Sequence, residues 1–105
     1  MEQIAWASGI FEGEGWIKKD KRRERAYEVA IKMSDFDVLQ RLQQAFNAGN
    51  VSANTVPNNP RHKQLYVWRV CNRKDIIKVL TLMLPYLGER RSYSASNAID
   101  NIDQC

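Results

Sequence analysis

The sequence predicts an α+β domain in which a four-stranded antiparallel sheet carries its helices on one face. Two observations lead to this class. Segments of helical and strand periodicity follow one another in the order α-β-β-α-β-β-α, with a further helix at the end, and the strands of each pair are joined by a connection too short for a crossover. Strands joined in this way pair as hairpins, which leaves one face of the sheet for the helices. The 105 residues fit one domain spanning 1–105.

In the first half, apolar residues recur at helical spacing over 1–14, and Gly15 ends the pattern. A strand is expected over 16–21 and a second one over 26–33, with residues 22–25 between them. The second strand alternates between the two faces of the sheet, as a half-buried strand does. Its apolar face consists of Tyr27, Val29, Ile31 and Met33.

The second half repeats this plan. The segment 35–47 has an apolar stripe at helical spacing, so it predicts a helix. The further elements expected are strands over 50–56 and 63–71, a helix over 75–84 that stops before Pro85, and a polar last helix over 92–102.

The composition excludes several classes of protein. Hydrophobic residues make up 44% of the chain and charged residues 27%, which excludes intrinsic disorder. One histidine and two cysteines are too few for a Cys/His zinc site or a disulfide framework. No apolar run approaches the roughly 18 residues of a membrane span, and no secretory signal is recognisable. We therefore expect a cytoplasmic protein that does not contact a membrane.

The positive charge is concentrated on the strands. The net charge is +4, and twelve of the 16 Lys and Arg residues map to the strands or the segments beside them. A free sheet face that mixes cations with polar and acidic groups can contact phosphates and read base edges. The candidate DNA contacts are Lys18, Asp20, Arg22, Arg23, Arg25, Glu28, Lys32, Asn50, Ser52, Asn54, Arg61, Lys63 and Arg69. From these residues alone, an ordinary solvated sheet face is an equally good interpretation.

The sharpest local signal is the segment ASGIFEGEG at 7–15. Gly9 and Gly13 lie on one helix face and permit close approach of another helix. Glu14 stands at the C-terminal end of that helix, where the helix dipole already places partial negative charge. A hard cation of the Mg²⁺ type would neutralise this carboxylate. The alternative interpretation is a solvent-exposed acid at a helix end.

This segment resembles the nine-residue motif of the LAGLIDADG homing endonucleases. Its small residues, apolar pair and two acids all have counterparts, namely Gly9, Gly13, Gly15, Ile10, Phe11, Glu12 and Glu14. The predicted order of elements also matches the family core. In addition, Pro85-Tyr86-Leu87 and the basic pair that follows resemble its C-terminal signature.

The resemblance implies a saddle-shaped sheet that binds a long duplex DNA site, and hydrolysis of both strands with Mg²⁺, for which Mn²⁺ can substitute. It implies that Glu14 and the Gly13 carbonyl hold the metal, and that Arg90 and Lys32 act near the scissile phosphate. The chain has one motif where two are needed, so a homodimer on a roughly palindromic site follows. The implied dimer interface consists of Ala5, Ser8, Gly9, Glu12 and Gly13. The implied setting is a bacterial or phage-infected cell, or an organelle.

The chain departs from the family pattern at two positions. Arg90 stands where lysine is common, and because arginine stays charged it stabilises transition-state charge rather than moving a proton. Met33 stands where glutamine is common. The function expected is a Mg²⁺-dependent site-specific DNA endonuclease. The alternatives are a non-catalytic nucleic-acid-binding relative, either an RNA maturase or a DNA-binding regulator, and an α+β interaction module unrelated to nucleic acid.

Overall fold

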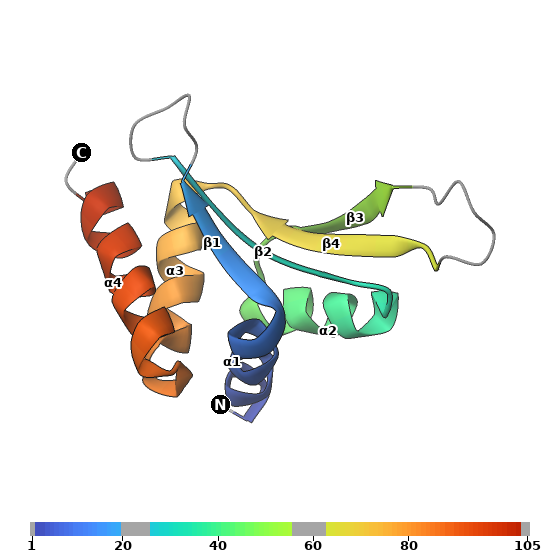
Figure 1. Ribbon diagram of the computed structural model, residues 1–105, viewed down its shortest axis with the longest axis horizontal. Helices are drawn as coiled ribbons and strands as arrows, with labels where there is room; N and C mark the ends of the chain where they lie inside the picture. The colour runs from blue at the N-terminus through green and yellow to red at the C-terminus, as the bar shows by residue number, and fades with distance from the viewer. Residues whose placement is uncertain (1, 20–25, 56–62, 104–105) are drawn as a thin grey trace.

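A computed structural model describes residues 2–19, 26–55 and 63–103 of the chain. The elements follow the predicted order (Figure 1) and are α1 (Glu2–Glu14), β1 (Gly15–Lys19), β2 (Tyr27–Met33), α2 (Phe36–Phe46), β3 (Asn50–Thr55), β4 (Leu65–Val70), α3 (Arg73–Met83), the 3₁₀ turn η1 (Leu84–Tyr86) and α4 (Glu89–Asp103). The predicted α+β class is confirmed.

Two helices begin earlier than the sequence predicts, and each start has a local cause. The side chain of Asn72 accepts hydrogen bonds from the backbone N–H groups of Lys74 and Asp75, so α3 begins at Arg73 rather than at residue 75. The last helix begins at Glu89 rather than at residue 92, because the Gly88 carbonyl accepts the Ser92 N–H at 2.8 Å.

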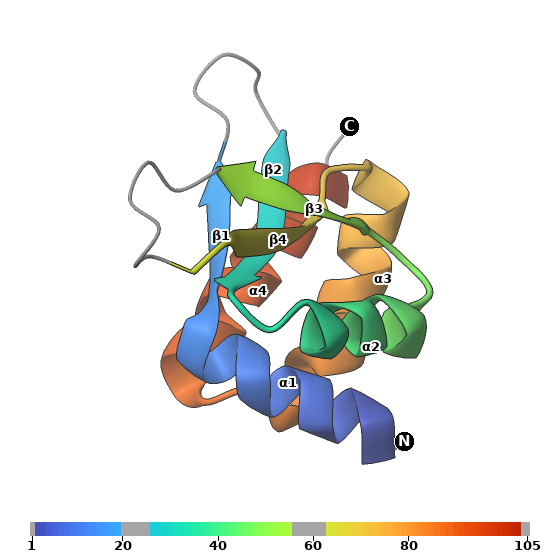
Figure 2. The same ribbon diagram turned by 90° about the vertical axis from the view of Figure 1, so that its right-hand side faces the viewer.

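The four strands form an open sheet in the order β1-β2-β4-β3, and every neighbouring pair is antiparallel. The two predicted hairpins therefore meet through β2 and β4. Figures 1 and 2 show the helices gathered on one side of this sheet. The other side is left open, as the sequence predicts.

The core lies between the sheet and the helices, and Trp68 is its largest buried side chain. The indole stacks on Phe46 with ring centroids 5.5 Å apart, and its Nε1 donates to the Ala48 carbonyl at 3.0 Å. Gly49 has a φ of +83°, and a Cβ there would stand 2.5 Å from the indole nitrogen. Only glycine fits this turn, so the step from α2 into β3 is fixed against the tryptophan.

The open face is less exposed than its alternating pattern suggests. Ala30 and Val67 point to the side opposite Ile31 and Trp68, yet they are as fully buried as those core residues. Three of their four neighbours across the strands are larger: Trp16 and Arg69 flank Ala30, and Lys32 lies beside Val67, whose other neighbour is Ser52. Long side chains thus cover the small apolar ones in the middle of this face.

Truncation of the central tryptophan should be costly. Trp68→Ala removes a fully buried ring and its hydrogen bond to Ala48, so we expect the free energy of unfolding to fall by about 3–5 kcal/mol. Urea unfolding measures this change. As a control, Tyr93→Ala at a 72% exposed position should shift it by no more than about 0.5 kcal/mol. Similar losses in both variants would contradict this assignment of the core.

Candidate nucleic-acid interface and metal site

The strand register brings most of the predicted DNA contacts onto one face. Directly opposed residues share a face, and so do residues two apart on one strand. Lys18 lies opposite Glu28, Asn50 opposite Arg69, and Ser52 opposite Val67, which is itself opposite Lys32. The predicted contacts on the open face are Lys18, Glu28, Lys32, Asn50, Ser52 and Arg69.

The other predicted contacts lie at or beyond the ends of the strands. Asn54 is exposed on β3, beside a register shift between Ala53 and Thr55. Lys63 is exposed and precedes β4. Five further predicted contacts lie outside the described residues, namely Asp20, Arg22, Arg23, Arg25 and Arg61.

Glu28 joins three strands at the middle of the open face. Its Oε2 accepts the indole Nε1–H of Trp16 at 3.0 Å, and its Oε1 lies 2.5 Å from the Arg69 Nε. Glu28 and Arg69 thus form an ion pair that gives the Arg69 side chain a preferred direction, although this side chain is 40% exposed. Sequence reasoning missed Trp16, although the hairpin register places it diagonally across from Glu28, within reach of a long side chain.

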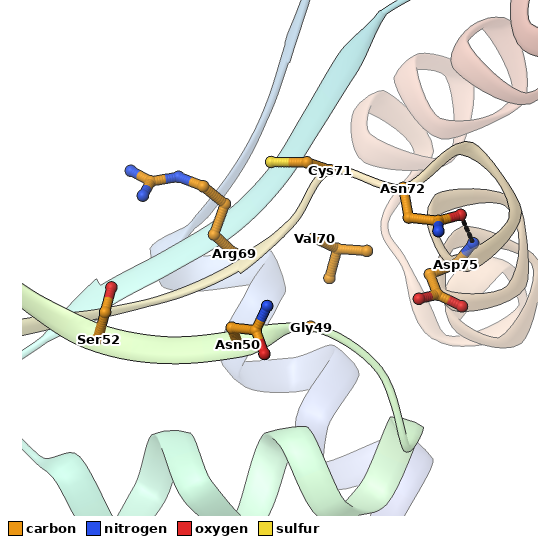
Figure 3. A pocket seen from close by; sticks show the side chains of 8 residues that line it. All are labelled: Gly49, Asn50, Ser52, Arg69, Val70, Cys71, Asn72 and Asp75. Carbon is orange, nitrogen blue, oxygen red and sulfur yellow. Dashed lines mark hydrogen bonds between the residues drawn. The ribbon is translucent and has the colours of Figure 1, made fainter.

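A polar hollow of about 310 Å³ opens where β3, β4 and α3 meet (Figure 3). Its lining residues are Gly49, Asn50, Ser52, Arg69, Val70, Cys71, Asn72 and Asp75. Partial burial raises the pKa of the Cys71 thiol, and the Glu28 carboxylate raises it further, while Arg69 acts in the opposite direction. The thiol is thus protonated at neutral pH and is no nucleophile. The hollow continues the polar open face.

The candidate metal ligands stand where α1 passes into β1. Glu14 is the last residue of α1 and is exposed, as is Gly13, and Gly15 begins the strand. A carboxylate and a main-chain carbonyl are hard oxygen donors, which suit Mg²⁺. Within residues 2–19, 26–55 and 63–103, no cluster of three or more His, Cys, Asp or Glu side chains could hold a metal. The described donors, Glu14 and the Gly13 carbonyl, fit a divalent ion when further ligands complete its coordination.

Two of the predicted interface residues make contacts within their own chain, and the assignment of Ser8 to an interface is corrected because its side chain is fully buried. Ser8 is fully buried, and its hydroxyl donates to the Ile4 carbonyl at 2.7 Å. The Glu12 carboxylate accepts the N–H of Gly88, and its Oε2 lies 3.4 Å from the Arg91 Nε. Ser8 therefore lies on the inner side of α1, whereas Glu12 keeps 35% of its side chain exposed and stays an interface candidate.

The remaining interface candidates are accessible. Gly9 and Gly13 are exposed, and a Cβ added at either position would meet nothing within 4 Å. Ala5 is partly exposed on the same helix. Nothing within the described part of the chain therefore requires glycine at positions 9 and 13.

The predicted catalytic cations stand apart from Glu14. Arg90 is exposed in the first turn of α4, and Lys32 is exposed on the sheet. No hydrogen bond or ion pair between described residues joins either one to Glu14. Sequence reasoning passed over the neighbouring Arg91, which packs against α1. Its side chain is 18% exposed, and its guanidinium lies 5.4 Å from the Phe11 ring centroid.

The described helices include none that is both long and apolar enough to cross a membrane.

The fold is that of solved homing endonucleases. I-CvuI, crystallised in complex with its target and with the I-CreI target, superposes with TM-scores of 0.77 and 0.78 at 16% and 18% identity. These matches cover 98% and 97% of this chain and 67% and 66% of I-CvuI. I-GzeII in complex with its DNA target gives a TM-score of 0.72 at 21% identity, over 96% of this chain and 35% of that one.

The chain thus spans about two thirds of the length of I-CvuI and about one third of that of I-GzeII. At these identities the superpositions show the fold alone. No curated protein matches the chain. The sequence itself carries the family assignment, since the family model of the LAGLIDADG-like domain matches residues 1–83, a span that includes α1, the whole sheet and α3. The chain therefore belongs to the LAGLIDADG family.

Proposed function

We propose that the chain is a site-specific double-strand DNA endonuclease that uses Mg²⁺ and acts as a homodimer of single 1–105 domains. One observation carries this proposal. The free carboxylate of the motif, Glu14, immediately precedes the strand that begins the open, partly basic face of the sheet. A duplex held on that face would bring its backbone to the end of α1, where metal-assisted hydrolysis needs a carboxylate.

The charges of the open face support a DNA ligand. Lys18 and Lys32 are exposed and have no acidic partner among the described residues, so they are free to contact phosphates. Asn50 and Ser52 add exposed hydrogen-bonding groups that can read base edges. Glu28 holds Arg69 in one direction, which favours a defined contact over general charge neutralisation.

The exposed glycines of α1 support the homodimer. A glycine inside a helix costs stability, so two of them with open space beside them need an explanation outside the chain. Close approach of a second α1 supplies one, and it brings two copies of Glu14 together. Two-fold symmetry then predicts a roughly palindromic target.

Glu14 and the Gly13 carbonyl would hold the metal, together with phosphate oxygens and the second copy of Glu14. The bound ion would polarise the scissile phosphate and lower the pKa of its water. Arg90 would stabilise the charge that develops on the phosphate, since it cannot act as a base. Lys32 would neutralise phosphate on the sheet face.

A DNA- or RNA-binding protein without nuclease activity, such as a maturase or a regulator, is the second candidate. Met33 favours it: the side chain is partly buried against the core at the end of β2 and offers no polar group where the family commonly has glutamine. The two candidates share the binding face and differ only in hydrolysis.

Loss of the Glu14 charge should abolish cleavage and spare binding. In Glu14→Gln the shape is kept, but the metal loses its charged ligand, while repulsion from phosphate is relieved. The assay uses a plasmid that carries a duplex selected by the wild-type protein from a randomised library, with Mg²⁺, Ca²⁺ or chelator. The matched control is Glu2→Gln, at the other end of α1. Cutting by Glu14→Gln, or by wild type in chelator, would refute this role.

The salt dependence of DNA binding should identify the binding face. Each lost phosphate contact lowers the slope of log K against log salt by about 0.9, so Lys18→Ala should show a decrease of that size. Lys78→Ala removes the same charge from α3 in the helix layer, where Lys78 contacts the Asn47 carbonyl, and should leave the slope unchanged. Fluorescence anisotropy with one duplex at several salt concentrations measures both. Equal slopes for the two variants would exclude the sheet face.

A bulky residue on the open side of α1 should separate the dimer. Gly13→Leu places a large side chain where we propose that two helices meet, so sedimentation should show a monomer and cleavage should be lost. Ser94→Leu adds the same side chain at an exposed position of α4 and should leave the dimer intact. A wild-type protein that remains monomeric with and without DNA would contradict the homodimer.

A further inference from the structure

The end of α1 and the beginning of α4 meet at one carboxylate. Glu12 accepts the backbone N–H of Gly88, and the Gly88 carbonyl accepts the Ser92 N–H at 2.8 Å. Gly88 is therefore the N-cap residue of α4. Its own N–H has no acceptor within the helix, and the Glu12 carboxylate accepts it. A negative charge at this end of a helix is also favoured by the helix dipole.

Arg91 holds the same carboxylate from a second direction. Its Nε lies 3.4 Å from the Glu12 Oε2, and its guanidinium lies 5.4 Å from the ring centroid of Phe11, one residue before Glu12. The Arg91 side chain is only 18% exposed. The Arg91 Nε makes no hydrogen bond among the described residues, so the ion pair with Glu12 is the contact that compensates this mostly buried charge.

Gly88 permits this contact because it has no side chain. A Cβ at this position would stand 2.6 Å from the Glu12 Oε1, so the end of the Glu12 side chain would have to shift to admit an alanine. The φ of Gly88 is not left-handed, so the backbone conformation itself does not call for glycine here.

We infer that Glu12 is a positioning residue, which locks the first turn of α4 to the last turn of α1 and thereby sets where Arg90 stands relative to Glu14. Glu14 lies two residues beyond Glu12, and Arg90 lies two residues beyond Gly88. A shift of one helix end against the other would therefore move the two groups that the proposed nuclease requires. The inference rests on that proposed function. It gives a role to Glu12, the acid of the motif that is not a proposed metal ligand.

The lock is tested first without any nuclease assay. The Gly88 amide is a donor to a carboxylate, and a charged acceptor makes the stronger hydrogen bond. By NMR, hydrogen exchange of the Gly88 amide should become about tenfold faster in Glu12→Gln. Glu89→Gln removes the neighbouring acid from the same helix turn and should leave this rate unchanged.

The second test separates positioning from binding and folding. Under single-turnover conditions with Mg²⁺, Glu12→Gln and Gly88→Ala should each cut the selected duplex about tenfold more slowly. The Kd for that duplex in Ca²⁺ should change little. Loss of the contact lowers the urea midpoint, so cleavage is compared at a temperature where urea unfolding shows that both variants are fully folded. Because both substitutions break one contact, the double variant should be no slower than either single variant. Glu89→Gln should cut at the wild-type rate.

The outcomes are distinct. Unchanged Gly88 exchange in Glu12→Gln would overturn the lock, and faster exchange with undiminished cleavage would overturn the positioning role. An equal loss of rate in Glu89→Gln would assign the effect to helix charge in general. A wild-type protein that binds the duplex and never cuts would refute the proposed nuclease and the positioning role together, while the exchange rates would still decide whether the lock exists.

Discussion

The packing of Phe11 against Gly15 is the constraint on which the arrangement of the candidate site depends. Phe11 is fully buried, and its ring occupies the space that a side chain at position 15 would need. Because residue 15 is glycine, α1 can pass into β1 with no connecting residue between them. The helix end, with Glu14 on it, is thereby held at the start of the sheet. A larger residue at position 15 would force apart the two elements whose junction carries the candidate metal ligand.

The two faces of the sheet serve different purposes, and the strands divide their residues accordingly. The inner face is a packed core centred on Trp68, whose position is fixed by a stacked ring, a hydrogen bond and a glycine turn. On the outer face, Glu28 links β1, β2 and β4 through an ion pair with Arg69 and a hydrogen bond from the Trp16 indole. A surface organised in this way loses little conformational entropy when a rigid duplex binds it, which favours a specific complex.

The sequence was sufficient to predict the order of the elements, the pairing of the hairpins and most of the open face. These features follow from local periodicity, which alternation over 26–33 and helical spacing over 35–47 make plain. The starts of α3 and α4 were less well predicted, since they depend on the hydrogen bonds of Asn72 and Gly88. The burial of Ala30 could not be predicted from its own strand, because the covering side chains come from β1 and β4.

The motif residues lie on different sides of α1. Helix geometry explains why the predicted interface residues Gly9 and Gly13 are accessible and why Ser8 is not. A helix turns by about 100° per residue, so residues four apart lie on one side and neighbouring residues do not. Ala5, Gly9 and Gly13 form one side, which is accessible. Ser8 and Glu12 form the next side, where Ser8 is fully buried and Glu12 contacts Gly88 but remains 35% exposed, so Ser8 cannot share an interface with the others.

The partner of Glu12 could not have been found from helix periodicity, because Gly88 is 76 residues distant in the sequence and only the folded chain brings the two together.

Two features of α1 still have no explanation within the described part of the chain, namely the exposed glycines and the single carboxylate at the helix end. Both lie on the same helix, and both would be accounted for by one event, the approach of a second α1 along the glycine side. A stable contact there requires a straight, firmly held helix end. The contacts of Phe11 with Gly15 and of Glu12 with Gly88 hold the end of α1 to β1 and to α4, so contacts within the protomer fix the helix surface on which the proposed dimer depends.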